Sequence, residues 1–158
     1  MIKVLFICHG NICRSPMAEY IMKNMLESER LTWAISCDSA ATSMEEIGHD
    51  MYPPAKRKLS EEGIPFERRR ARQITRSDYE KYDYLILMER YNIRNALRIF
   101  REDPENKLTL MKDYTGEGGD IADPWYTGDF DLTYKELDRG IRALIEYLNT
   151  PKVKNSNF

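Results

Sequence analysis

A thiol, a guanidinium and a glycine lie within one short segment near the start of the chain. The segment reads Cys8-His9-Gly10-Asn11-Ile12-Cys13-Arg14-Ser15. It follows an apolar run and precedes a helical pattern, so its backbone N–H groups should surround a turn at a helix N-terminus, where the helix dipole favours an anion. A guanidinium can hold two phosphate oxygens at once. We therefore expect residues 9–13, Arg14 and Ser15 to bind a tetrahedral phosphate dianion.

The same positive field favours the thiolate form of Cys8. A thiolate beneath a bound phosphate ester can attack phosphorus in line. Ser15 can donate a hydrogen bond to the sulfur and stabilise it as a leaving group. Gly10 lets the backbone approach the anion, and Asn11 tolerates left-handed backbone angles while its amide ties the loop together. The alternative is that Cys8 is an ordinary buried cysteine at the end of a strand.

A candidate proton donor lies far along the chain. An ester oxygen must be protonated as it leaves phosphorus, and a positioned carboxylic acid typically contributes about 10²–10⁴-fold to the rate. Asp123 is the candidate, because it lies in a long polar loop, precedes Pro124 and is followed by two aromatic residues. An Asp-Pro pair by itself more often marks a turn, so the catalytic interpretation depends on the presence of Cys8.

The sequence predicts strands and helices in alternation to hold these groups. Short apolar runs predict buried strands, and amphipathic or capped segments predict helices. The expected strands are 4–7, 34–37, 84–88 and 108–111, and the expected helices are 15–26, 54–62, 91–101 and 132–148. A long polar loop is expected over 112–129, and loops of that length are often functional.

This alternation predicts an α/β fold. We expect a single domain with a four-stranded mostly parallel sheet, helices on both faces and the phosphate loop after the first strand. The chain has 158 residues, an ordinary length for one domain. The domain should cover residues 1–150, followed by a frayed C-terminal tail over residues 151–158.

Composition argues against several other classes of protein. The formal net charge of −2 does not favour nucleic acid as a partner, and the basic run Arg68–Arg72 is more often a solvated surface than a phosphate-binding patch. No apolar stretch approaches the roughly 18 residues of a membrane span, and the first residues lack the cleavage site of a signal peptide. We therefore expect a cytoplasmic monomer without membrane insertion. Three cysteines make no disulfide framework, and neither His9 nor His49 has the neighbours of a metal site, so no metal or organic cofactor is expected.

Residues 7–18, ICHGNICRSPMA, resemble the signature of the low-molecular-weight protein tyrosine phosphatases. The resemblance continues through Asp38–Ser43, Ala71–Thr75, Asp83–Ile86 and Asp123–Tyr126 to the last helix, so it covers nearly the whole chain. It implies hydrolysis of phosphotyrosine in protein substrates through a cysteinyl-phosphate intermediate. It also implies that Cys8 is the nucleophile, that Arg14 binds the phosphate and that Asp123 is the general acid and then the base. The family's sheet, with its phosphate loop after the first strand, agrees with the pattern above.

The resemblance also implies what surrounds the phosphate. Ile12, Trp125 and Tyr126 should form walls against which an aryl phosphate packs, although both aromatics could be ordinary core or surface residues. Ser39 matches the serine that bonds to the loop residue Asn11 and holds the loop in shape.

The role of Cys13 has two possible interpretations. By resemblance, Cys13 and Cys8 form a reversible disulfide that shields the nucleophile from over-oxidation. The alternative is that Cys13 is a small packing residue. Cys37 is expected in the core.

Three positions depart from the family pattern. Arg69 stands near the place of a histidine that joins the network behind the phosphate loop, and Glu89 replaces an aspartate after the third strand. Glu45 stands where a bulky residue often lines the pocket mouth; a carboxylate there should repel acidic phosphopeptides and favour a basic substrate. The stretch 49–52 is also longer than usual and should reshape the rim.

Other activities of the same fold fit less well. Arsenate reductases of this type pass a disulfide to two later cysteines, and only Cys37 follows Cys13 here. Protein arginine phosphatases typically have threonine at the Ile12 position and lack the aromatic pair, so Ile12, Trp125 and Tyr126 favour phosphotyrosine. A non-catalytic phosphate-binding module would lack the nucleophile or the acid, and both candidates are present.

Overall fold

The apolar run near the start of the chain forms an inner strand of the sheet. In the computed structural model, which describes residues 1–151 and 153, strand β1 (Ile2–Cys8) is buried at every residue except Lys3. It pairs on one side with β2 (Ile35–Ala41) and on the other with β3 (Tyr84–Leu87), which in turn pairs with β4 (Leu108–Leu110). All three pairings are parallel and the order is β2-β1-β3-β4, so the expected sheet is confirmed.

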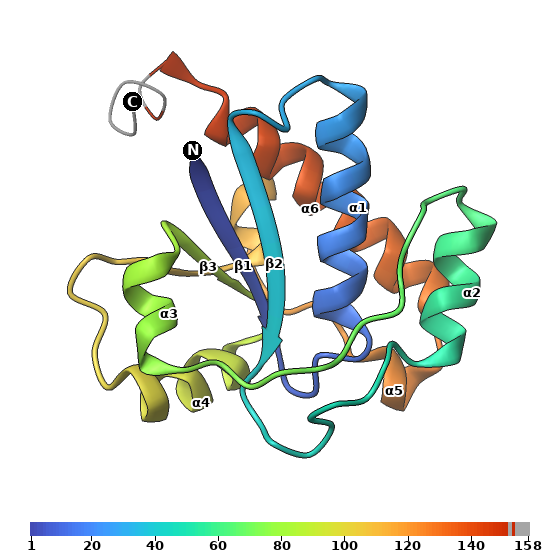
Figure 1. The fold of residues 1–158 in the computed structure, drawn as a ribbon, viewed down its shortest axis with the longest axis horizontal. Helices are drawn as coiled ribbons and strands as arrows, with labels where there is room; N and C mark the ends of the chain where they lie inside the picture. The colour runs from blue at the N-terminus through green and yellow to red at the C-terminus, as the bar shows by residue number, and fades with distance from the viewer. Residues whose placement is uncertain (152, 154–158) are drawn as a thin grey trace.

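Helices cover both faces of this sheet, as Figure 1 shows. They are α1 (Arg14–Ser28), α2 (Pro53–Glu61), α3 (Arg76–Lys81), α4 (Arg90–Phe100), α5 (Pro124–Thr127) and α6 (Phe130–Leu148), with a 3-10 helix η1 (Met111–Thr115). Val4 and Phe6 belong to the core under α1 and α6, whereas Leu5 and Ile7 belong to the core under α3 and α4. Successive strand residues point to opposite faces, so an uninterrupted apolar run is what a strand between two helical layers needs.

The ends of the strands determine where a site can form. Because all four strands are parallel, their carboxyl ends meet at one edge of the sheet, the edge where ligands bind in open α/β folds. The loop 9–13 leaves β1 at this edge, and the segment 42–52 leaves β2 there. The short connection 88–89 leaves β3 there as well. The chain after β4 returns to this edge before α5, near the bottom of the view in Figure 1.

Four elements differ from the expected ones. Strand β2 runs to Ala41, because each of its residues pairs in register with β1 up to Cys8. Helix α3 was not expected, because its six residues are mostly polar. A Thr75–Asp78 capping box marks its start, and Asp78 Oδ2 accepts a bond of 2.8 Å from the Thr75 backbone N–H. The 3-10 helix η1 begins at Met111, so β4 ends one residue earlier than expected. The rest of η1 and all of α5 lie within the expected loop 112–129, so that prediction was wrong in part.

The C-terminal tail is described at two residues only. Val153 is buried against the core, and Pro151 is exposed. The rest of the predicted tail lies outside the described residues. None of the described helices is long and apolar enough to cross a membrane.

Candidate active site

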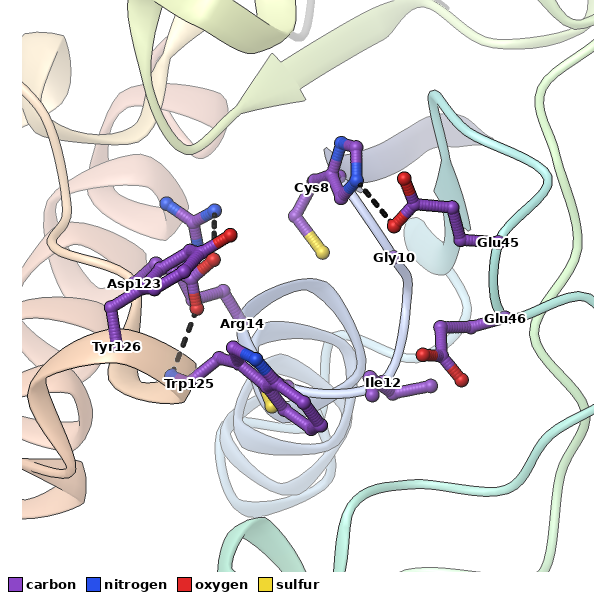
Figure 2. Close-up of a pocket in the computed structure, with 11 residues that line it drawn as sticks. Cys8, Gly10, Ile12, Arg14, Glu45, Glu46, Asp123, Trp125 and Tyr126 are labelled. Atoms are coloured by element: carbon purple, nitrogen blue, oxygen red, sulfur yellow. Dashed lines mark hydrogen bonds and ion pairs between the residues drawn. The ribbon is translucent and has the colours of Figure 1, made fainter.

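The loop between β1 and α1 curves around a pocket at the carboxyl edge of the sheet (Figure 2). The pocket is lined by residues of the segment 8–14, by Glu45 and Glu46, and by Asp123, Trp125 and Tyr126. The structure therefore brings together the predicted nucleophile, guanidinium, acid and walls, although more than a hundred residues separate Arg14 from Asp123.

The Cys8 thiol lies at the inner end of this pocket, where β1 ends. The residue is only 3% exposed, and its sulfur points toward the centre of the pocket in Figure 2. Its Sγ lies 3.0 Å from Ser15 Oγ, and it accepts a hydrogen bond of 3.3 Å from the Asn11 backbone N–H. Donors directed at the sulfur stabilise negative charge on it, which is what a nucleophilic thiolate requires.

The Arg14 guanidinium is held beside the thiol by three acceptors. Its Nη1 donates to the Ile121 carbonyl at 2.7 Å, and its Nη2 donates to Glu89 Oε1 at 2.9 Å and to Asp123 Oδ2 at 3.4 Å. Burial acts to lower the pKa of Arg14. The negative charges of Cys8, Asp123 and Glu89 act in the other direction and prevail, so the pKa is raised and the group stays charged. A buried cation at the inner end of a pocket attracts an anion.

Asp123 lies beside this cation in the pocket, at the start of α5 (Figure 2). Its Oδ1 accepts a bond of 3.0 Å from the Trp125 backbone N–H and thereby caps α5. Pro124 follows at the first helical position, where a missing N–H costs nothing. The Asp-Pro pair is therefore a helix start, and that start fixes the carboxylate at the pocket.

The walls have unequal exposure. Trp125 is 52% exposed and packs on Tyr52, with ring centroids 4.7 Å apart, whereas Tyr126 is 84% exposed. The Tyr52 backbone N–H donates to the Ile12 carbonyl at 2.9 Å, so the long stretch 49–52 connects the phosphate loop to the aromatic wall. The pocket has Ile12 on one side and the aromatic pair on the other, an arrangement that fits a flat ring.

A hydrogen-bond network behind the loop holds its shape. Asn11 has a left-handed φ of 60°, and its Nδ2 donates to Ser15 Oγ at 2.8 Å and to Ser39 Oγ at 3.0 Å. Ser39 in turn donates to Glu19 Oε1 at 2.6 Å. Asn11 and Ser15 are both fully buried, so their side chains lie behind the loop and do not line the pocket.

Arg69 completes this network. Its Nη1 donates to the Asn11 carbonyl at 2.6 Å, and its Nη2 donates to Asn11 Oδ1. The Arg72 backbone N–H donates to the same Oδ1 at 3.2 Å. The basic run 68–72 is thus not all solvated surface, because Arg69 binds the loop and Arg72 pairs with Asp78 at 2.9 Å.

Replacing Arg69 with methionine should loosen the phosphate loop. Hydrogen bonds to a charged group contribute about 1.5–3 kcal/mol, so we expect a comparable fall in the free energy of unfolding and at least a tenfold fall in kcat/KM. Arg69→Lys should restore part of both. Denaturant titration and initial rates with p-nitrophenyl phosphate measure the two quantities.

The matched control is the neighbouring Arg70→Met. Arg70 is exposed and makes no hydrogen bond or ion pair with any described residue, so both quantities should stay near the wild-type values. Equal losses in the two variants would show that charge in the basic run matters and that the bonds to Asn11 do not.

Cys13 and Cys37 are both buried free thiols in the structure. Cys13 lines the pocket, and burial raises its pKa, with a further contribution from the negative charge of Cys8. Cys37 lies in the core under α1, as expected. Among the described residues, no group of three or more histidine, cysteine, aspartate or glutamate side chains could hold a metal ion.

Several contributors were not identified from the sequence. Glu89 and the Ile121 carbonyl hold Arg14, Glu19 holds Ser39, Glu46 joins Glu45 in the lining, and Tyr52 supports Trp125. Of these, Glu89 had been noted only as a departure from the family pattern. Tyr52 lies in the stretch 49–52 that was expected to reshape the rim, but its contact with Trp125 was not predicted. Glu19 is far along the chain from Ser39, and Ile121 contributes only a backbone atom, so neither has a local sequence signal.

The α/β fold and the pocket define the class of protein: a phosphatase whose phosphate-binding loop follows its first strand. The family model for low molecular weight phosphotyrosine protein phosphatases matches residues 3–154. The chain is 33% identical over 154 residues to the low molecular weight protein-tyrosine-phosphatase YfkJ of Bacillus subtilis, covering 96% of this chain and 99% of that one. The crystal structure of YfkJ superposes with a TM-score of 0.90, covering 94% of each chain.

Two further relatives bear on the activity. The human low molecular weight phosphotyrosine protein phosphatase is 34% identical over 148 residues, covering 90% of this chain and 93% of the human one. The crystal structure of DARP, a Drosophila arginine phosphatase, is 26% identical with a TM-score of 0.85, covering 95% and 99% of the two chains. The chain belongs to the low molecular weight phosphotyrosine protein phosphatase family and is a protein tyrosine phosphatase.

Proposed function

We propose that this enzyme hydrolyses phosphotyrosine in protein substrates, with Cys8 as nucleophile and Asp123 as general acid and base. The observation that carries the proposal is the position of the Cys8 sulfur. It lies at the inner end of the pocket, 3.0 Å from Ser15 Oγ, and shares that pocket with Arg14 and Asp123. Backbone N–H groups of residues 9–13 and the Arg14 guanidinium bind the phosphate oxygens.

In the first step, the Cys8 thiolate attacks phosphorus and forms a sulfur–phosphorus bond as the bond to the phenolic oxygen breaks. Asp123, protonated, gives its proton to that oxygen, so a neutral tyrosine leaves. The charged Arg14 stabilises the equatorial oxygens, where negative charge is concentrated in the transition state.

In the second step, water attacks the cysteinyl-phosphate. Asp123, now a carboxylate, takes a proton from that water, and the sulfur leaves as a thiolate. Ser15 donates a hydrogen bond to the leaving sulfur across the 3.0 Å contact. The products are inorganic phosphate and the original enzyme, so the cycle needs no metal, oxidant or organic cofactor.

We also infer where the enzyme acts and how it is organised. It is a cytoplasmic monomer, and residues 1–150 form its phosphatase domain. A peroxide can oxidise the Cys8 thiolate to a sulfenic acid, and the Cys13 thiol then displaces water from it to form a disulfide. A thiol reductant restores both cysteines by exchange, which protects the nucleophile from further oxidation. Both cysteines line the same pocket, which supports this step. The partners are phosphotyrosine proteins and not nucleic acid, in line with the formal charge of −2.

The arginine phosphatase activity of one structural relative gives the second candidate substrate. The pocket of this chain favours a phenyl ring over a guanidinium, because Ile12 lies on one side and Trp125 and Tyr126 on the other. Both substrates present the same phosphoryl group, so the walls alone decide between them.

Initial rates on matched peptides test the proposal. With EDTA and a thiol present, the wild-type enzyme should hydrolyse p-nitrophenyl phosphate. It should also hydrolyse a phosphotyrosine peptide with a kcat/KM about tenfold to 200-fold above that of the matched phosphoserine peptide. The phosphoserine side chain is short and has no ring, so it cannot fill the space between the pocket walls. Faster turnover of phosphoarginine would favour the second candidate. No turnover of any substrate would leave a phosphate-binding role.

A further inference from the structure

Two glutamates lie at the mouth of the pocket, each beside a histidine: Glu45 beside His9 and Glu46 beside His49. The side chain of Glu45 is 68% exposed and that of Glu46 is 29% exposed, and both line the pocket. Among the described residues, Arg14 is the only lysine or arginine that lines the pocket, and its side chain is 1% exposed and bound to two carboxylates. We call Glu45 and Glu46 the acidic rim.

The two carboxylates are held in place. His9 Nε2 lies 2.9 Å from Glu45 Oε2, and His49 Nδ1 lies 2.5 Å from Glu46 Oε2. The stem of Glu46 rests on the phosphate loop, since a Cβ at Gly10 would come within 3.4 Å of Glu46 Cγ. Each carboxylate therefore uses Oε2 in a contact within the protein, whereas its Oε1 makes no hydrogen bond or ion pair with any described residue. Figure 2 shows both side chains on one side of the pocket, across from Trp125 and Tyr126.

We propose that the acidic rim selects phosphotyrosines that have a lysine or arginine beside them. This inference rests on the proposed function, because it concerns the residues that flank the hydrolysed phosphotyrosine. The phosphate itself is bound deep in the pocket by Arg14 and the loop, so the flanking residues of a peptide lie at the mouth. A basic flank meets two carboxylates there, and an acidic flank is repelled by them.

The opposite wall does not offset this preference. Trp125 and Tyr126 carry no charge, and aromatic faces attract lysine and arginine side chains rather than carboxylates. Each exposed ion pair changes an equilibrium by roughly 1.4-fold to fivefold. Two such pairs together therefore predict a preference of about twofold to 25-fold in kcat/KM.

The test compares three phosphotyrosine pentapeptides that differ only in the two residues next to the phosphotyrosine: both lysine, both alanine or both glutamate. For the wild-type enzyme at low salt, kcat/KM should be about twofold to 25-fold higher for the lysine peptide than for the glutamate peptide. The ratio should fall toward one in Glu45→Gln/Glu46→Gln, and also in wild type at high salt, because salt screens exposed charges.

The matched control is Glu29→Gln/Glu146→Gln. It removes the same charge from two exposed positions near the opposite edge of the sheet, after α1 and late in α6, so the ratio should stay at the wild-type value. The inference would be overturned if the alanine peptide is hydrolysed but the wild-type ratio of kcat/KM is near one. It would also be overturned if the Glu45→Gln/Glu46→Gln variant keeps the wild-type ratio. If no peptide is hydrolysed, the proposed function itself fails.

Discussion

Cys8→Ser should abolish hydrolysis of p-nitrophenyl phosphate, with kcat at least about 10⁴-fold below wild type, because removing the nucleophile of a covalent mechanism has effects of that order or larger. A serine hydroxyl at this position stays protonated near neutral pH, so the bond to phosphorus cannot form at a useful rate. Phosphate binding should survive, since Arg14 and the loop N–H groups remain. Steady-state rates and calorimetric titration with inorganic phosphate measure the two properties.

Cys37→Ser makes the same chemical change outside the pocket. Its thiol lies in the core and donates to the Glu19 carbonyl at 3.5 Å, a bond that a hydroxyl can also make. The variant should therefore keep most of the wild-type activity. If Cys8→Ser retains activity within about a hundredfold of wild type, Cys8 is not the nucleophile.

Asp123→Asn should lower kcat by about 10²–10⁴-fold, the usual contribution of a positioned general acid. Asparagine keeps the oxygen that caps α5 through the Trp125 N–H, so the loop retains its shape and only the proton donor is lost. The loss should be larger for phenyl phosphate than for p-nitrophenyl phosphate, because phenolate is the poorer leaving group and depends more on protonation. Rates with both substrates provide the comparison.

A second helix cap supplies the control for this variant. Asp129 Oδ1 accepts a bond of 2.9 Å from the Leu132 N–H at the start of α6, away from the pocket lining. Asp129→Asn should leave kcat close to wild type. Equal losses with the two substrates in Asp123→Asn would assign the effect to a disturbed loop and not to proton transfer.

The phosphate loop could be predicted from the sequence because its parts are contiguous. A buried strand, a turn and a helix start follow one another within the first 16 residues, so the chain direction alone places Cys8 and Arg14 at the same turn. The sheet was predicted for a similar reason: a parallel sheet with helices on both faces leaves uninterrupted apolar strands, which are visible in any short window.

The supports of the loop could not be predicted in the same way. Arg69 reaches Asn11 across 58 positions and Glu89 reaches Arg14 across 75, so only the folded chain brings them together. One support is the carbonyl of Ile121, and backbone atoms carry no sequence signature. The long polar segment 112–129 was expected to be a loop because its two helices have only four or five residues each, too few for periodicity to appear.

Carboxymethylation by iodoacetate tests the central claim, that Cys8 performs the chemistry, most directly. We predict one carboxymethyl group on Cys8, loss of activity in proportion to that modification, and slowing of both by inorganic phosphate, which occupies the loop. Cys13 and Cys37 should remain unmodified, because burial raises the pKa of each thiol. Activity that persists after Cys8 is fully modified, or that is lost in step with modification of Cys13 or Cys37, would contradict this account.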